Sequence, residues 1–417
     1  MSERTRRRGR TVRWGVPVAA IAVVAGAIGA GPVIAAVQGD PVLPERTAEQ
    51  LLADAVQAAR SGPDPMSGTL VQTSSLGLPG LPQVPGAGGS SPATLLAGSH
   101  ELKVWYGGAD RVRLALPGRM SETDLIVNGD QVWLWESEAN TATRITAGRE
   151  VLAEHRPGGG TLPGPGSGSG NPGNPGNPGD AGDAGDRAAE SLPAAATPQQ
   201  IAREVLERAG ADTAISVTDN EKVAGRDAYQ LTLAPKDDAS LVREIRLALD
   251  GETLVPLRVQ VYADGSAEPA FEVGFTTVTF SAPAPEHFAF TPPPGAKVEE
   301  KPLADLVGDM ADRQEKEEKL AGEAEIAGEG WTAVAVLPFS ERELRGLAQG
   351  GKDGGEAAED GGAVADALLK SAEQVSGAWG SGRVVRTKLV SALLTDDGRL
   401  LVGAVTPERL IEVAGQK

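Results

Sequence analysis

The side chains that most often carry out catalysis are few in this chain of 417 residues, and they are not grouped. There is no cysteine, which excludes thiol chemistry, disulfides and cysteine-ligated metal centres. The three histidines, His100, His155 and His287, lie far apart and show no spacing that would pair two metal ligands. No serine-nucleophile or zinc-protease motif accompanies them. The sequence therefore predicts no catalytic residue, no metal site and no cofactor.

One glycine-rich stretch imitates a phosphate-binding loop. The segment from Gly346 to Lys352 has the glycine and lysine spacing of such a loop. The next residue is Asp353, where the loop would need Ser or Thr to hold magnesium. The stretch also follows a predicted helix, whereas a phosphate-binding loop follows a strand. We therefore expect no nucleotide site there.

The charge of the chain argues against a nucleic-acid partner. Lysine and arginine number 39 against 57 aspartates and glutamates, so the net charge is −18 at pH 7. Residues 1–13 form a basic segment with six arginines, which makes the remainder more acidic still. An acidic body repels phosphate backbones, so nucleic-acid binding is not expected.

An uncharged apolar run, residues 14–37, follows the basic segment. As a helix it would extend about 36 Å, enough to cross the hydrocarbon core of a membrane. The basic flank would stay in the cytoplasm, which places the rest at the extracytoplasmic face of the plasma membrane. Two interpretations remain open: a single-pass transmembrane anchor with the N-terminus inside, or a signal peptide cleaved near Ala36, which would release a secreted protein.

Short helices and strands occupy most of the chain after residue 46. A capping box at Thr47 and Gln50 predicts a helix that stops before Gly62. A first set of strands is predicted at 67–75, 101–106, 110–116, 122–127, 131–136 and 141–146, and a second at 214–218, 229–233, 243–249, 254–262, 271–280 and 288–291. Between the sets, a Gly/Pro/Asn/Asp-rich segment at 157–186 is predicted to be a disordered linker, followed by a helix at 197–209.

The C-terminal part is predicted to be a separate small domain. Residues 301–329 are highly charged and are expected to form a helical tether. Residues 330–417 are expected to form a small α+β domain. Its predicted elements are strands at 331–337, 383–394 and 400–405, a helix at 364–379 and a final helix from Thr406.

Apolar side chains stand on both faces of the predicted strand 131–136. Trp133 and Trp135 point one way, and Val132 and Leu134 point the other. Stripes of this kind can line an apolar cavity or pack as ordinary core against a helix, and both interpretations remain open for each residue. The candidate lipid-contacting residues are Trp105, Trp133, Trp135, Leu257, Val259, Phe271 and Phe275.

Several of these segments carry a family resemblance. The stretches "ELKVWYGGADRVRLALP" and "DLIVNGDQVWLWESEANTATRI", then "REIRLALDGETLVPLRVQVY" and "FEVGFTTVTFSAPAPEHFAFTPPPGAKV", resemble the LolA/LppX/RseB-like lipoprotein-carrier superfamily. The match covers residues 47–300, interrupted by the linker at 157–186. The resemblance implies an α+β fold in which an antiparallel half-barrel sheet holds helices in its concave face. It also implies a protein that holds a lipid or a lipoprotein acyl chain.

The expected function is non-enzymatic binding of a lipid or lipoprotein acyl chain in an apolar half-barrel outside the cytoplasm. Two alternatives remain. The first, which the resemblance also implies, is an RseB-type sigma-factor regulator that contacts a membrane anti-sigma factor. An envelope scaffold with no ligand is the other. A soluble shuttle must leave its membrane, so a membrane anchor at 14–37 would argue against a shuttling role.

Overall fold

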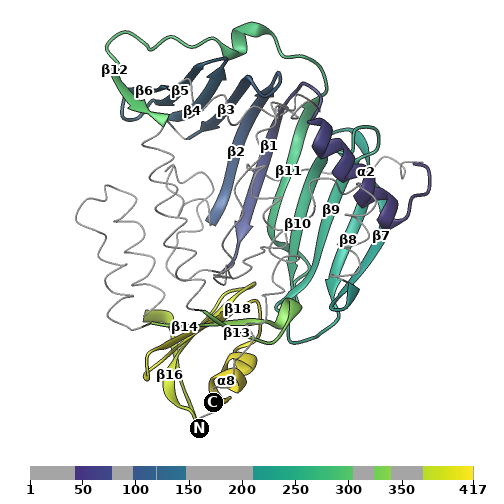
Figure 1. Ribbon diagram of the computed structural model, residues 1–417, viewed down its shortest axis with the longest axis vertical. Helices are drawn as coiled ribbons and strands as arrows, with labels where there is room; N and C mark the ends of the chain where they lie inside the picture. Colours follow the sequence, from purple (N-terminus) through teal and green to yellow (C-terminus); the bar gives the residue numbers. More distant parts are fainter. Residues whose placement is uncertain are drawn as a thin grey trace, which may run out of the picture.

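The computed structural model describes residues 43–77, 97–118, 120–146, 210–303, 324–339 and 370–416. Two β-sheets, of twelve and six strands, organise these parts of the chain (Figure 1). The apolar run at 14–37, the linker at 157–186, the predicted helix at 197–209 and most of the tether at 301–329 lie outside the described residues. Within the described parts, the helices are too short or too polar to span a bilayer.

Helix α2 (Ala48–Ser61) begins where the sequence predicts. The Gln50 N–H donates to Thr47 Oγ1 (3.2 Å), and the Thr47 N–H donates to Gln50 Oε1 (2.9 Å), so the capping box is confirmed. The helix ends at Gly62, whose φ of +76° is a conformation that glycine adopts without strain. Leu51 and Ala53 form its buried side.

The twelve-stranded sheet joins the two predicted strand sets into one layer. β1 pairs with β11, so the first strand of the first set lies beside the predicted strand 271–280 of the second. The order across the sheet is β12-β6-β5-β4-β3-β2-β1-β11-β10-β9-β8-β7, antiparallel throughout except for the parallel pair β12–β6. The strands are β1 (Met66–Ser75), β2 (Ala97–Tyr106), β3 (Arg111–Pro117), β4 (Glu122–Asn128), β5 (Gln131–Glu136), β6 (Thr141–Thr146), β7 (Thr213–Val223), β8 (Arg226–Pro235), β9 (Val242–Asp250), β10 (Pro256–Ala263), β11 (Pro269–Thr279) and β12 (Lys297–Pro302).

The sheet is open, because β12 and β7 form its two edges and do not pair with each other. An open sheet with a helix on one side is consistent with the expected half-barrel. Figure 1 shows it running from β12 at the upper left to β7 at the right, with α2 over the β7 side.

One predicted strand of the second set is wrong. Residues 288–291 do not pair. Instead a short 3-10 helix, η2 (Pro285–Phe288), precedes irregular chain that leads into β12, a strand that was not predicted and that lies at the boundary between the predicted half-barrel (47–300) and tether (301–329). The reason is proline. Pro283, Pro285 and the run 292–294 lack the N–H that a strand needs to continue its ladder.

In the described residues of the C-terminal domain, a six-stranded antiparallel sheet is accompanied by one α-helix. The sheet order is β13-β14-β18-β17-β16-β15. Val384, Leu393 and Leu401 of the sheet pack against Leu410 of the helix, so this part has an apolar core of its own. The elements are β13 (Glu325–Ala327), η3 (Gly330–Thr332), β14 (Val334–Pro338), β15 (Glu373–Gly377), β16 (Gly380–Arg386), β17 (Ser391–Thr395), β18 (Arg399–Gly403) and α8 (Pro407–Gly415).

Two predictions for this domain need correction. The predicted helix at 364–379 is wrong over its last part, where β15 pairs with β16 as an edge strand. The single predicted strand at 383–394 is a hairpin of β16 and β17. Its turn is held by the Thr387 hydroxyl, which accepts hydrogen bonds from the N–H groups of Leu389 (3.3 Å) and Val390 (2.9 Å). Side-chain acceptors of this kind favour turns over strands.

The C-terminal domain contacts one end of the large sheet through hydrogen bonds and apolar packing. Trp331 Nε1 donates to Thr213 Oγ1 at 2.7 Å, and the Trp331 ring packs with Ile245, Val259 and Val273. Backbone bonds add to this junction, from the Leu241 N–H to the Ala404 carbonyl (2.8 Å) and from the Lys388 N–H to the Leu76 carbonyl (2.8 Å). The two sheets therefore share a buried apolar contact.

Candidate functional site

The seven predicted lipid-contacting residues do not all lie on one face of the sheet. Residues opposite each other on neighbouring strands point to the same side of a sheet. Trp133 lies opposite Ile126, Ile126 opposite Arg113, and Arg113 opposite Trp105, so Trp105, Trp133 and Trp135 share one face of the sheet, the tryptophan face.

The other four predicted residues pack elsewhere, three of them buried and Phe271 partly buried. Val259 and Phe271 pack in the apolar cluster that contains Trp331. Leu257 and Phe275 belong to a separate buried cluster with Leu70 and Val104. Val104 and Leu70 point away from the tryptophan face, because they alternate with residues paired on it. The structure therefore divides the predicted set between separate surfaces.

The tryptophan face is covered by the chain itself. We call residues 283–296 the strap. Within it, His287 stacks on Trp105 with ring centroids 5.2 Å apart and an interplanar angle of 19°. Phe290 lies 5.5 Å from the ring of Trp133 and 6.1 Å from that of Trp135. Contacts of this kind favour ordinary packing over ligand contact for the three tryptophans.

Phe288 is the buried anchor of the strap, with 1% of its surface exposed. Its ring fills the space over Gly107, where an added Cβ would lie 3.1 Å from the ring. Glycine at the β2–β3 turn thus makes room for Phe288.

Charged groups lie under the same strap. Arg113 Nη2 donates to Asp124 Oδ2 at 2.7 Å, and Asp124 is almost fully buried. Glu122 is 3.5 Å from the same guanidinium, which also lies 5.3 Å from the centre of the Trp105 ring. Burial raises the pKa of Glu122 above its ordinary value, and its hydrogen bond with Asp124 and the charge of Asp124 raise it further, while Arg113 and Lys103 partly offset the rise.

The opposite face of the same strands is apolar and partly covered: Val104 and Thr143 are buried, and Leu114 packs against the cluster of Leu257 and Phe275. Two rows of side chains cross from β2 to β6, each made of residues that pair directly across the strands. The six central residues, on β3, β4 and β5, are all half-buried. The two-row apolar face consists of Tyr106, Val112, Val127, Val132 and Ile145 in one row, and Val104, Leu114, Leu125, Leu134 and Thr143 in the other.

Of this face, only Val132 and Leu134 stood out in the sequence as an apolar stripe, and neither belongs to the candidate set. A signal for the rest was present. Val112 and Leu114, then Leu125 and Val127, are spaced two apart in consecutive predicted strands. What was missing was the pairing register that sets these pairs side by side.

The same face of the sheet is closed in its other half. The register from β2 through β1, β11 and β10 leads to Leu247 on β9, which therefore shares the side of the two-row apolar face. There Leu51 of α2 packs with Tyr229, Leu249 and Leu254, all of them buried.

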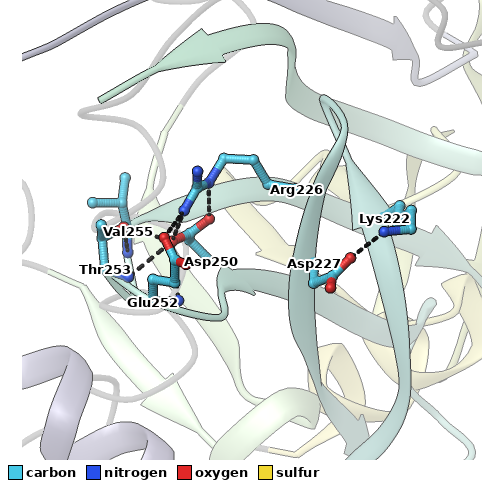
Figure 2. A network of polar contacts seen from close by, with 7 residues as sticks. All are labelled: Lys222, Arg226, Asp227, Asp250, Glu252, Thr253 and Val255. Carbon is cyan, nitrogen blue, oxygen red and sulfur yellow. Dashed lines mark hydrogen bonds and ion pairs between the residues drawn. The ribbon is translucent and has the colours of Figure 1, made fainter. Parts of the chain in front are cut away.

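A polar network holds the ends of the strands β7 to β10 (Figure 2). Asp250 is fully buried and accepts from Arg226 Nη2 (3.0 Å) and from the N–H and hydroxyl of Thr253 (2.8 and 2.9 Å). Burial alone would raise the pKa of Asp250, but the bonds from Arg226 and Thr253 outweigh burial and hold it below its ordinary value. The carboxylate is committed to the turn after β9 and is structural.

The described residues contain no cluster of His, Asp and Glu able to hold a metal ion. His100 and His287 lie on separate elements, and His155 is outside the described residues.

No protein-family model matches this chain, and no curated protein matches it. Among solved structures, it is similar to the Pseudomonas aeruginosa MucA/MucB complex, with 14% identity, a TM-score of 0.36, and 88% of this chain and 96% of that one covered. A LolA superfamily protein from Nitrosomonas europaea matches with 12% identity and a TM-score of 0.19, covering 59% and 99%. A putative outer membrane lipoprotein-sorting domain from Vibrio parahaemolyticus matches with 12% identity and a TM-score of 0.19, covering 58% and 96%. The LolA superfamily is the one that the sequence resembles. At TM-scores below 0.5 these matches transfer no ligand or partner to this chain.

Proposed function

We propose that this protein is a non-enzymatic, extracytoplasmic binder of a lipid or lipoprotein acyl chain. The bound acyl chain would lie on the two-row apolar face. The observation that carries the proposal is the half-buried state of six aliphatic side chains in two adjacent rows on β3, β4 and β5. Elsewhere on the same side of the sheet, aliphatic residues such as Leu249 and Leu51 are fully covered by the protein.

The dimensions of the rows suit an alkyl chain. Four strand spacings separate β2 from β6, which is about 19 Å, comparable with an extended fatty acyl chain. An alkyl chain lying across the strands would contact one side chain from each strand in each row. Burial of its methylenes would contribute about 0.8 kcal/mol per CH₂ before the entropy cost of binding.

The tryptophan face is the less suitable surface. Trp105, Trp133 and Trp135 already contact rings of the strap. An acyl chain there would have to displace Phe290, and the buried Phe288 beside it, before it gained any contact. The proposed site is therefore on the side of Val132 and Leu134, and not on the side of the tryptophans.

The first test is native mass spectrometry of the full chain purified without detergent, followed by titration with a fluorescent long-chain fatty acid. The double variant Leu125→Gln/Leu134→Gln places amide groups in the middle of one row. Loss of two leucine contacts should weaken binding about tenfold or more. The matched control is Trp133→Phe, on the same strand and opposite face, which should bind as the unaltered chain does.

Three outcomes count against the proposal. Equal binding by the folded double variant would remove this face as the site. Weakened binding by Trp133→Phe would return the site to the tryptophan face. Failure of the unaltered chain to hold any lipid would favour the alternatives, a regulator of RseB type that contacts a membrane anti-sigma factor or a scaffold without a ligand.

A further inference from the structure

The two rows of the two-row apolar face are not equally open. The row that begins with Val104 ends with Thr143, and both of these residues are buried. In the other row, which we call the outer row, every side chain is half-buried. An alkyl chain that crosses all the strands therefore follows the outer row. The outer row consists of Tyr106, Val112, Val127, Val132 and Ile145.

The edge strand β12 extends the outer row by one residue (Figure 1). β12 runs parallel to β6, with Lys301 opposite Ile145. Paired residues on neighbouring strands point to the same side of a sheet, and successive residues alternate. The neighbouring pair, Arg144 and Glu300, forms an ion pair at 3.8 Å on the opposite side, which agrees with this register. Lys301 is therefore the last residue of the outer row.

Lys301 ends a row that is otherwise uncharged. The four cations of β2 to β6 all point to the tryptophan face. They are Lys103, Arg111, Arg113 and Arg144. On β12, Lys297 is committed to Glu299, at 2.6 Å. Lys301 is exposed and lies within ion-pair distance of no carboxylate in the part of the chain that the structure describes. Its ammonium group is therefore available to a ligand anion.

The carboxylates on the same side leave the charge of Lys301 largely uncompensated. The pKa of Glu299 is lowered first by the hydrogen bond and the charge of Lys297, and Lys301 contributes least. Glu136 is four residues from Val132 along β5, which places it more than about 13 Å from the outer row. That separation exceeds the screening length of physiological salt.

The two ends of the outer row differ in polarity. At the β2 end, Tyr106 lies opposite Met66, which packs against a buried apolar cluster, and a charged group there would lose its hydration. The turn residues Asp110 and Asp130, each two positions from a valine of the outer row, are exposed acids that repel an anion. Only the β12 end, with Lys301, offers an anion both water and a cation.

We propose that the two-row apolar face binds a single-chain amphiphile that ends in a carboxylate, with the carboxylate against Lys301 and the tail directed toward β2. This assignment rests on the proposed acyl-chain site and adds the class and orientation of the ligand. Five strand spacings separate β2 from β12, about 24 Å, so one extended chain and its head fit in a single line. One open row and one available cation match one chain and one negative charge.

The test is isothermal titration calorimetry of the full chain with lauric acid and lauryl alcohol, which share a tail and differ in the charge of the head. At about pH 8 the acid is ionised. The measured quantity is the Kd of the alcohol divided by the Kd of the acid. In Lys301→Met this ratio should fall about threefold to fivefold, the value of an exposed ion pair, and in Lys301→Glu it should fall further. Lys103→Met removes the same charge from the opposite face and should leave the ratio unchanged.

The outcomes separate this assignment from the acyl-chain site itself. If both probes bind but the ratio is unchanged in Lys301→Met and Lys301→Glu, or falls equally in Lys103→Met, the site remains and the assignment to Lys301 is wrong. If the unaltered chain binds neither probe, the acyl-chain site is wrong and this assignment falls with it. A two-chain phospholipid in the native mass spectrum of the purified protein would overturn the single-chain class.

Discussion

The two halves of the large sheet differ in how their shared face is covered. Over β8 and β9, α2 closes the face, and Leu51, Tyr229 and Leu249 are buried. Over β3 to β5, residues of the same kind, such as Leu125 and Leu134, are only half-buried. Similar apolar strands therefore serve as core in one half and leave accessible surface in the other. A binding surface in this protein is defined by where the covering elements end, and not by where the largest apolar residues lie.

The two halves also differ in how completely their buried polar groups are hydrogen-bonded. Asp250 accepts hydrogen bonds from Arg226, Thr253 and the Glu252 N–H. Under the strap, Arg113 Nε, Asp124 Oδ1 and Trp133 Nε1 are buried side-chain atoms without a hydrogen-bond partner. Buried polar atoms without partners cost stability. The half held by Asp250 is the more completely satisfied of the two.

The largest expected loss of stability comes from disrupting the polar network around Asp250 (Figure 2). Asp250→Ala would leave Arg226 without its buried partner and the turn after β9 without its acceptor, so we expect unfolding to become easier by about 3–5 kcal/mol. Asp227→Ala is the matched control, because the Lys222–Asp227 pair is more exposed and should be worth about 0–1 kcal/mol. Urea denaturation measures both. Equal losses would show that the buried network has no special role.

The second prediction compares one face in the two halves. Leu249→Ala should destabilise the protein by about 2–5 kcal/mol because it opens a cavity under α2. Leu125→Ala, at a half-buried position, should cost about 1 kcal/mol, since water already reaches the side chain. Thermal unfolding of both variants gives the comparison. A cost for Leu125→Ala as large as that for Leu249→Ala would mean that the two-row apolar face is ordinary core.

A third prediction uses pH. The pKa of Asp250 is lower in the folded state than its ordinary value near 3.8. Its carboxylate therefore contributes stability that is fully present above about pH 4 and is lost as pH falls through the lowered folded value. Asp250→Asn should flatten the acid limb of the stability curve, whereas Asp227→Asn should leave it steep. Denaturant midpoints measured from neutral pH down to pH 2 would contradict this assignment if both variants kept the same acid limb.

The smallest effect concerns the element that closes one half. Thr47→Ala removes the side-chain acceptor at the start of α2 and should cost about 1 kcal/mol. Thr47→Ser keeps the acceptor and should be nearly neutral. Because α2 covers the half that is already closed, neither variant should alter acyl-chain binding. A change in that binding would show that α2 contributes to the site.

The local elements follow from short stretches of sequence. The capping box at Thr47, the hairpin at Asn128-Gly129 and the alternation of Val132 to Trp135 were predictable, because each depends on residues a few positions apart. Gly129 has φ of +63°, a value that the tight turn requires and that glycine accepts without strain. Opposite faces for the tryptophans and for Val132 and Leu134 follow from the two-residue period of a strand.

Which of those faces is covered depends on contacts between distant parts of the chain. The tryptophan face is closed by residues near 287–290, which are more than 150 positions from Trp133 in the sequence. The closed half depends on α2, which reaches Tyr229 and Leu249 across a similar separation. Local propensity carries no information about such distant pairs, because apolar burial is not directional and any apolar face satisfies it equally. The strand order joining β1 to β11 selects among the candidate faces, and that order is fixed when the whole chain packs.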